Sequence, residues 1–269
     1  MPMMMVGDIA NVKAQVVIQE VLGLARVQYR LRELCQVIAM PHLVADVRTA
    51  TDYTGSEKVP ELVEADIKSQ AYSKTSFDLW KNVVHLAISA EAGLKSDIDV
   101  LGLEVKSAAK ELARMENSQI ATEIEADSTA KSGSAWATGS NNPTDDIMAG
   151  ADPIFDAGYE AKYLAMKHTQ YVSLITNDLL AGFLERGTWV VDGKLPTVCG
   201  LKIIIDQNVT ANKAYVIDPA APAIILGEGP ELAIEYGQDD PRFFKGYALA
   251  KFIEPSFVNT SACRVLTGI

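Results

Sequence analysis

One segment near the middle of the chain limits what the whole sequence can fold into. Residues 97–126 contain no proline, and Gly102 is the single glycine among them. Their apolar side chains recur every three or four positions, at Leu101, Val105, Ala108, Leu112 and Met115. This spacing predicts one long amphipathic α-helix with a single apolar stripe. Such a helix is roughly 45 Å long, and it far exceeds the mean helix of about 11–12 residues. The segment therefore favours a protein that spans a long distance and whose copies pack side by side in an assembly.

The charge of the chain argues against a protein that coats nucleic acid. The formal net charge is −11, and phosphate binding requires an excess of Lys and Arg. The acidic excess is uneven, because residues 1–50 carry five basic and four acidic side chains while residues 51–150 carry nine and seventeen. The N-terminal segment is therefore the part that best tolerates a nearby polyanion.

The sequence predicts neither a disulfide framework nor a membrane span. The three cysteines, Cys35, Cys199 and Cys263, form no CxxC pair, which favours reduced and buried thiols. No run of 18 apolar residues is present, and the first ten residues lack the pattern of a secretory signal.

The first half of the chain changes its pattern twice. A broad apolar face from Val16 to Ile38 predicts a second long helical region over residues 11–40, ended by Pro41. Its apolar stripe packs either on its own core or on a neighbouring subunit. Residues 44–70 lose the helical period and predict a β-excursion with an exposed tip at residues 55–58, returning as a strand over residues 72–88.

The second half predicts a Gly/Ser/Asn-rich loop followed by alternating short helices and strands. The loop covers residues 128–146. Helices are expected over residues 147–157 and 168–183. Short strands are expected at 163–166, 202–205, 214–217, 224–226, 231–236, 244–253 and 257–265.

No motif for catalysis or for a cofactor is found. The sequence has no Walker loop, GxGxxG, HExxH or GxSxG motif. His85 is expected to be a partly buried strand residue, and the pairs Asp145–Asp146 and Asp239–Asp240 lie beside Pro and Gly, where turn and cap chemistry explains them. We therefore predict no catalytic, cofactor-binding or metal-binding residue.

Four phrases stand in order along the chain: FDLWKNVVHLAISAEAGLKS, DPIFDAGYEAKYLAMKHTQYVSLIT, LPTVCGLKIIIDQNVTANKAYVIDP and LAIEYGQDDPRFFKGYALAKFIEPSFVNTSACRVL. Together they resemble the major capsid proteins of tailed viruses with the Hong Kong 97 fold. The first phrase, followed by the long helix, resembles the end of the family's extended E-loop and its spine helix. The second phrase resembles the opening of the axial domain, the third resembles a later pair of its strands, and the fourth resembles the closing hairpin of the peripheral domain.

The resemblance implies an α+β fold with four parts. These are an N-terminal arm at 1–43, an E-loop at 44–88, a peripheral domain at 89–146 and 237–269 with a spine helix at 97–126, and an axial domain at 147–236. In this family the arm and the E-loop lie across neighbouring subunits. The implied contacts between subunits involve Val16, Val17, Leu24, Leu31, Gly55, Lys58, Asp239 and Asp240. The implied residues facing the lumen and the DNA are Lys13, Arg26, Arg30 and Arg32.

The implied function is that of a structural protein, not an enzyme. The subunit would form pentamers and hexamers of an icosahedral shell around double-stranded DNA, held by weak, non-specific contact. A portal, and a scaffold or a protease, would take part in assembly in the host cytoplasm. An encapsulin shell enclosing a cargo enzyme is the alternative, and a small-molecule enzyme of α+β fold is a third reading. Some relatives crosslink an E-loop Lys to an Asn, but Gly246 stands at the matching position here, which argues against a crosslink from Lys58 or Lys68.

Overall fold

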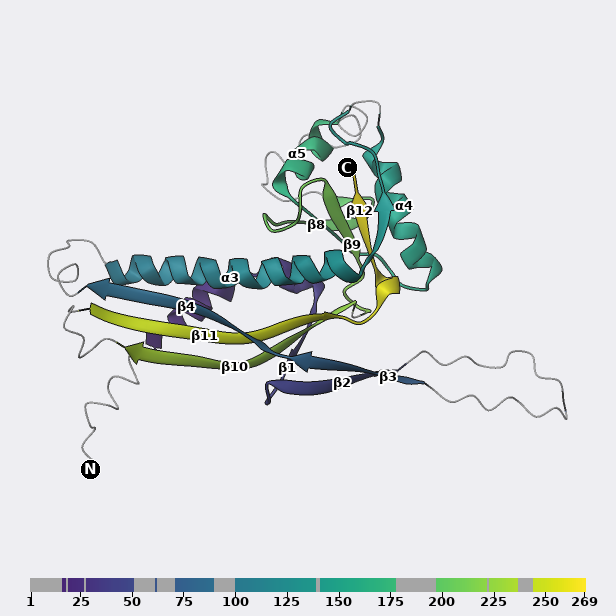
Figure 1. The fold of residues 1–269 in the computed structure, drawn as a ribbon. Helices are drawn as coiled ribbons and strands as arrows, with labels where there is room; N and C mark the ends of the chain where they lie inside the picture. The colour runs from purple at the N-terminus through teal and green to yellow at the C-terminus, as the bar shows by residue number, and fades with distance from the viewer. Residues whose placement is uncertain are drawn as a thin grey trace.

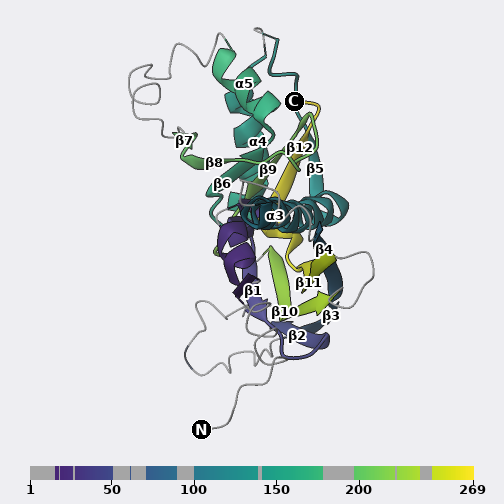
Figure 2. The ribbon, with the colours of Figure 1, turned by 90° about the vertical axis from the view of Figure 1, so that its left-hand side faces the viewer.

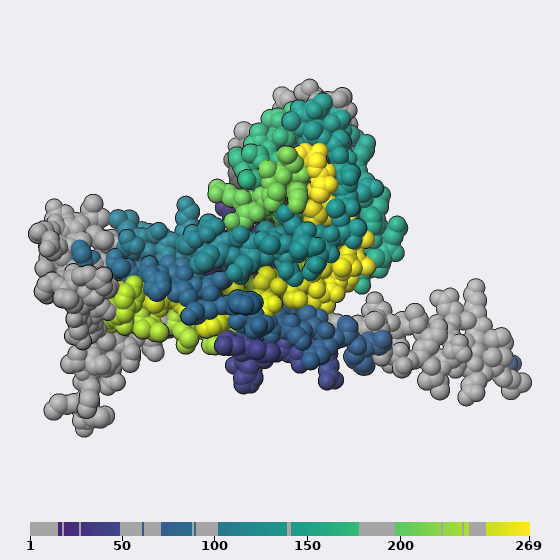
Figure 3. All heavy atoms as spheres, viewed as in Figure 1, coloured from purple at the N-terminus to yellow at the C-terminus, as the bar shows by residue number. Residues whose placement is uncertain are grey.

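The computed structural model describes an elongated body with a second unit standing on one end of it (Figures 1 and 3). The described residues are 16–17, 19–26, 28–50, 61, 71–89, 100–138, 141–177, 197–221, 223–236 and 244–269. A long helix, α3 (Val100–Asp127), runs along the body and reaches the second unit at its C-terminal end.

The body is built on a four-stranded sheet in the order β1-β10-β11-β4. Its strands are β1 (Gln36–Ala39), β4 (Trp80–Ser89), β10 (Ile224–Tyr236) and β11 (Phe244–Phe257). β1 pairs with β10 in parallel, and the other two pairings are antiparallel. Helix α3 covers one face of this sheet, as Figure 1 shows.

The long helix predicted from the apolar stripe is confirmed over its described part. Val105, Ala108 and Leu112 are each less than 5% exposed, and Met115 is half-buried. They pack against Leu86 of β4 and Leu249 of β11. Residues 97–99 and the side chain of Leu101 lie outside the described residues.

The second unit is a six-stranded sheet in the order β5-β12-β9-β6-β8-β7. Its strands are β5 (Thr129–Ser132), β6 (Tyr163–Met166), β7 (Thr197–Val198), β8 (Leu201–Ile205), β9 (Lys213–Ile217) and β12 (Cys263–Thr267). Helices α4 (Pro143–Asp156) and α5 (His168–Thr176) belong to the same unit (Figure 2). Helix α4 begins earlier than residue 147 because Asn142 caps it and Pro143 stands at its first turn.

The sheets divide the chain differently from the predicted domain boundaries. β5 and β12, both expected in the peripheral domain, pair with each other in the six-stranded sheet. β10, expected in the axial domain, pairs with β1 and β11 in the body. The chain leaves the body after β11 through the short helix η2 (Thr260–Ala262), which delivers the last strand to the other unit.

The predicted β-excursion begins and ends as a pair of strands that packs against the body (Figure 1). β2 (Val44–Ala50) and β3 (Tyr72–Asp78) pair antiparallel. The strand expected over residues 72–88 is in fact two strands, because the chain passes from the hairpin to the body sheet at Leu79, whose N–H donates to the carbonyl of Leu43. The tip at residues 55–58 and Lys68 lie outside the described residues.

The single long helix predicted over residues 11–40 is wrong. In the described part, residues 19–26 are helical, then a short helix, η1 (Leu31–Leu34), follows, and residues 36–39 form β1. The apolar residues near position 38 belong to a strand because β10 offers them a hydrogen-bonding partner, which overrides the local helical pattern.

Several smaller expectations also change. Residues 224–236 form one strand rather than two, with a bulge that places Gly229 and Pro230 between the paired residues Glu228 and Glu231. His85 is exposed and meets the ring of Tyr236 edge-on at 5.8 Å. The loop expected at 128–146 contains β5 and a buried Trp136. Of the three thiols, Cys263 is buried, Cys35 is partly buried and Cys199 is exposed.

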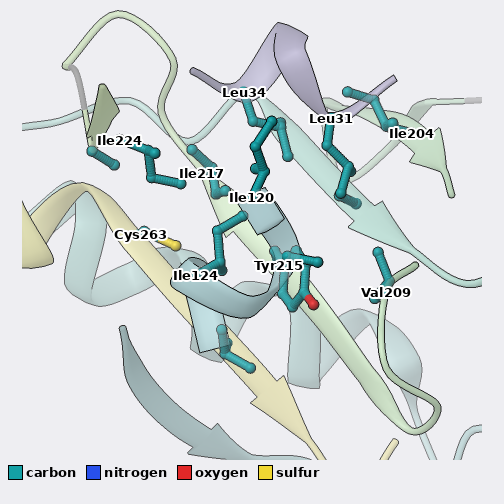
Figure 4. Close-up of a cluster of buried hydrophobic side chains, with 14 of the residues drawn as sticks. Leu31, Leu34, Ile120, Ile124, Ile204, Val209, Tyr215, Ile217, Ile224 and Cys263 are labelled. Atoms are coloured by element: carbon teal, nitrogen blue, oxygen red, sulfur yellow. The ribbon is translucent and has the colours of Figure 1, made fainter. Parts of the chain in front are cut away.

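One hydrophobic core joins the two units. Figure 4 shows Ile120 and Ile124 of α3 between strand residues of the six-stranded sheet and the N-terminal segment. Leu31 and Leu34 of η1 enter the same core and are almost completely buried. The body and the second unit are therefore one packed subunit, closed in part by its N-terminal residues.

Candidate functional site

The described residues offer no site for metal chemistry and no helix able to span a membrane. No group of three or more metal-ligating side chains comes together in the part of the chain that the structure describes. Within the same residues, no helix has the length and apolar character of a membrane span. The distinctive site is instead the junction at which the N-terminal segment crosses α3 and the body sheet.

The N-terminal helix buries its apolar face on the body of its own subunit. Val17, Val21, Leu22 and Ala25 are each less than 9% exposed and pack in one cluster with residues of α3, β4 and β11. The sequence left open whether this stripe lies on its own core or on a neighbouring subunit. In the structure it lies on its own core.

Four charged side chains from four elements meet where this helix ends, and we call them the charged cluster: Arg32 of η1, Glu116 of α3, Glu228 of β10 and Lys251 of β11. Lys251 Nζ lies 2.8 Å from Glu116 Oε2 and 2.9 Å from Glu228 Oε1. Arg32 Nη1 lies 3.5 Å from Glu116 Oε1, and Arg32 Nη2 is hydrogen-bonded to Glu228 Oε2. Each carboxylate therefore contacts both cations.

The charged cluster is neutral as a whole and mostly removed from water. The side chains of Glu116 and Lys251 are 1% and 4% exposed, and those of Arg32 and Glu228 are both 23% exposed. The ring of Tyr29 lies beneath both cations, with Lys251 Nζ 4.5 Å from its centroid. Cations over an aromatic face are stabilised by the ring quadrupole, so Tyr29 completes the shell around the cluster.

The environment favours the charged forms of three cluster members. Burial alone would raise the pKa of Glu228, but the hydrogen bonds and positive charges of Lys251 and Arg32 lower it below its ordinary value. Burial alone would lower the pKa of Lys251, but Glu116 is the main influence that raises it. The pKa of Arg32 is raised by the same two carboxylates against the effect of burial.

Neighbouring polar residues of α3 hold the same junction. Asn117 Oδ1 accepts a hydrogen bond from the N–H of Leu31, and Asn117 Nδ2 donates to the carbonyl of Gln28 and to Asp206. Two residues further along the helix, Gln119 exchanges two amide hydrogen bonds with Asn82, which tie α3 to β4.

The C-terminal end of α3 is fixed to the six-stranded sheet by Glu125. Its carboxylate accepts hydrogen bonds from Tyr215 Oη and from the N–H of Thr210, and it lies 2.7 Å from Lys213 Nζ. Burial alone would raise the pKa of Glu125, but these partners lower it. Helix α3 is thus tied by side chains to the N-terminal segment, to the body sheet and to the second unit.

The structure places the predicted contact residues in different environments. Val16 is 58% exposed and Leu24 is half-buried, whereas Val17 is 7% exposed. Leu31 is completely buried in its own subunit, so the prediction that it contacts a neighbour is wrong. The other predicted contacts, Gly55, Lys58, Asp239 and Asp240, lie outside the described residues.

Only part of the predicted basic surface is free in the subunit. Arg26 is exposed, and the guanidinium of Arg30 donates to the carbonyl of Ile205 at 2.8 Å. The guanidinium of Arg32 is paired with Glu116 and Glu228 within the subunit. Lys13 lies outside the described residues.

Comparisons with known proteins identify the family that has this fold. The family model described as phage capsid protein matches residues 86–258, more than half of the chain. The chain belongs to the phage capsid protein family. The subunit is accordingly a shell-forming major capsid protein, and its α+β fold is of the Hong Kong 97 type. Comparison with curated proteins gives no match.

Solved capsid structures share the fold at low sequence identity. A virus-like particle from Pyrococcus furiosus matches with a TM-score of 0.66 and 15% identity, covering 94% of this chain and 98% of that one. The capsid of the cyanophage P-SCSP1u matches with a TM-score of 0.66 and 16% identity, covering 88% and 86%. A structure of Mycobacterium phage Che8 matches with a TM-score of 0.63 and 14% identity, covering 84% of each chain.

The sequence did not reveal the charged cluster, although two signals of it are present. Glu116 stands four residues after Leu112, on the continuation of the apolar stripe of α3. Lys251 stands in the apolar run YALAKFI, at a position whose alternation with Tyr247 and Leu249 puts it on the face that α3 covers. Two opposite charges at buried positions are a signal for an ion pair.

Proposed function

We propose that this chain is the major capsid protein of a tailed virus or provirus, and that it assembles into an icosahedral head around double-stranded DNA. The family match is the observation that carries the proposal. The elongated shape of the described subunit supports it, because a long body suits a protein that is packed side by side with its neighbours (Figure 3).

In this proposal the body is the peripheral domain and the six-stranded unit is the axial domain. Helix α3 is the spine helix, and the hairpin of β2 and β3 is the base of the E-loop. The boundaries follow the sheets, so residues 224–257 belong to the peripheral domain, and residues 129–132 and 263–267 belong to the axial domain. The axial domains surround the axes of pentamers and hexamers.

We assign intersubunit contacts to residues that the subunit leaves accessible or that lie beyond its described part. Val16 and Leu24 belong to the N-terminal helical segment, Gly55 and Lys58 lie at the predicted E-loop tip, and Asp239 and Asp240 stand between β10 and β11 in the sequence. Val17 and Leu31 are left out because they are buried in their own subunit.

Contact with the packaged DNA is weak and non-specific in this proposal. The chain carries a net charge of −11, so a uniformly basic lining is not available. Lys13, Arg26 and Arg30 remain the favourable positions. A portal, together with a scaffold or a protease, completes assembly in the host cytoplasm, and no catalytic step is assigned to the subunit itself.

Electron microscopy of the purified full-length protein, together with sedimentation, tests the proposal. We expect closed icosahedral particles, because closed symmetry satisfies one set of contacts in every copy. Monomers or dimers alone, under conditions that keep the protein soluble, contradict it. Particles that enclose a cargo enzyme rather than DNA when isolated from their native host would favour the encapsulin alternative, which no observation favours now.

A further inference from the structure

The charged cluster joins parts of the chain that are far apart in sequence. It also separates two parts of the N-terminal segment that are held on the subunit by different numbers of contacts. Downstream of it, Leu34 is buried in the shared core and residues 36–39 are paired in the sheet. Upstream of it, the helix at residues 19–26 has one apolar face on the body and no strand pairing. The cluster lies between a firmly anchored part and a part held by fewer contacts.

The positive and negative charges of the charged cluster are equal in number, so the loss of one charge leaves another without its partner. The cluster contains two cations and two carboxylates, and Glu116 Oε1 accepts no hydrogen bond although it is buried. The nearest cation to this oxygen is Arg32, at 3.5 Å. Neutralising one carboxylate leaves an uncompensated positive charge in a place with little water, which is strongly unfavourable.

Solvent reaches the charged cluster from one side. A surface pocket is lined by Leu22, Arg26, Tyr29, Arg32, Glu33, Glu228, Glu231 and Lys251. Glu228 is therefore the accessible carboxylate, and Glu116 lies behind it. Of the two cations, Arg32 is the one with partial exposure, so it is the cation that can leave for water.

We propose that the charged cluster is an acid-sensitive latch, which holds the N-terminal helix on the body at neutral pH and releases it when Glu228 takes up a proton. On release, Arg32 turns to solvent and Tyr29 loses the cations above its ring. Residues 16–29 then detach, while Leu31, Leu34 and β1 stay in place. The latch is a property of the subunit and goes beyond the proposed shell function.

The charged and titratable groups around the latch determine whether it opens as the pH falls or as the pH rises. The N-terminal segment contributes Arg26, Tyr29, Arg32, Glu33 and the thiol of Cys35, α3 contributes Glu116, β10 contributes Glu228 and Glu231, and β11 contributes Lys251. The pKa of Glu228 is lower in the folded subunit than in the unfolded chain. Its contribution is therefore present above the ordinary glutamate range, about pH 4.3, and is lost as the pH falls through the lowered value.

Hydrogen exchange of the full-length protein tests the latch. Exchange is followed by mass spectrometry from pH 7 to pH 3.5 at constant ionic strength, after correction for the intrinsic rate at each pH. We expect residues 16–29 to lose at least tenfold of their protection at the acid end while residues 105–124 of α3 remain protected. A flat profile for residues 16–29, or a loss of protection in both segments at the same pH, overturns the proposal.

Two variants and a control separate the latch from general acid unfolding. Glu228→Gln imitates the neutral carboxyl and is expected to expose residues 16–29 at pH 7. The charge-balanced variant Glu228→Gln/Arg32→Gln keeps the Lys251–Glu116 pair and is expected to remove the acid transition while the helix stays protected. As the control, Glu111→Gln breaks an exposed ion pair with Arg114 on α3 and should keep the wild-type dependence of exchange on pH. An unchanged acid transition in the charge-balanced variant overturns the proposal even if the single variant does not fold.

Discussion

Lys251 of β11 donates a hydrogen bond of 2.8 Å to Glu116 of α3, and both side chains are more than 95% buried. Removing an ion from water costs a large desolvation free energy. A pair at this depth is stable only because the opposite charges and the neighbouring hydrogen bonds offset that cost. The pair ties the long helix to the central part of the body sheet.

Replacing Lys251 by Met should destabilise the subunit by about 3–5 kcal/mol, because two buried carboxylates would then share one cation. Urea unfolding of soluble capsomers measures the effect. The double variant Lys251→Met/Glu116→Leu keeps the Arg32–Glu228 pair and should recover most of the loss. If the double variant is less stable than the single one, the burial of unpaired charge is not the cause.

Truncation of Leu112 tests the packing of the long helix. Leu112 is 3% exposed and belongs to the cluster that includes Leu86 and Leu249. Leu112→Ala should cost about 2–5 kcal/mol, and Leu112→Asp should cost more because it buries an unpaired charge. Lys110→Ala, on the exposed face, should stay within about 0.5 kcal/mol in unfolding. A lower particle yield from Lys110→Ala would place this residue in a contact between subunits. Equal, near-zero effects of Leu112→Ala and Lys110→Ala on unfolding would contradict the packing of α3.

Replacing each of two helical glycines by alanine should change the stability of the subunit in opposite directions. A Cβ added at Gly23 meets no atom within 4 Å, so Gly23→Ala should stabilise the subunit by about 0.5–1 kcal/mol. A Cβ at Gly150 in α4 would lie 2.7 Å from a methyl of Leu266, which is fully buried, and 3.5 Å from a methyl of Val216. Gly150→Ala should therefore destabilise by about 1–3 kcal/mol. Thermal unfolding of the two variants side by side checks the contrast, and a shift of the same sign in both would be inconsistent with it.

The partners of Glu125 make the stability of the subunit depend on pH. Because they lower the pKa of Glu125 in the folded state, its contribution is present above the ordinary glutamate range and is lost as the pH falls through the lowered value. Glu125→Gln should cost about 1.5–3 kcal/mol at pH 7 and much less near pH 3.5. Denaturant unfolding at both values measures the difference, with Glu111→Gln as the exposed control. A penalty that is the same at both pH values would refute the electrostatic account.

Removal of residues 1–40 should prevent folding of the subunit rather than block assembly alone. The deletion removes Leu31 and Leu34 from the shared core and β1 from the sheet. Removal of residues 1–15 leaves these contacts and the helix at 19–26 in place. Circular dichroism and sedimentation of both truncated proteins compare the outcomes, and a cooperatively folded 41–269 fragment would show that the N-terminal segment is an independent arm.

The elements that the sequence predicted well are those whose pattern is local. The stripe from Val105 to Met115 and the run at residues 163–166 each carry enough period or apolar length to define an element. β1 was missed because its apolar residues continue the spacing of the preceding helix, and it becomes a strand only through β10, about 190 residues later. The charged cluster was missed because its four residues come from four elements, and no local pattern shows that they meet.

The last strand of the chain has a consequence for how the protein is made. β12, at residues 263–267, inserts between β5 and β9, so the six-stranded sheet stays divided until these residues have been synthesised. Long-range pairing of this kind is slow to form and leaves unpaired strand edges exposed in the meantime. A nascent chain therefore lacks the finished second unit until residues 263–267 have been made and have paired with β5 and β9. Folding of the second unit therefore waits for β12, although the other strands of its sheet are made earlier.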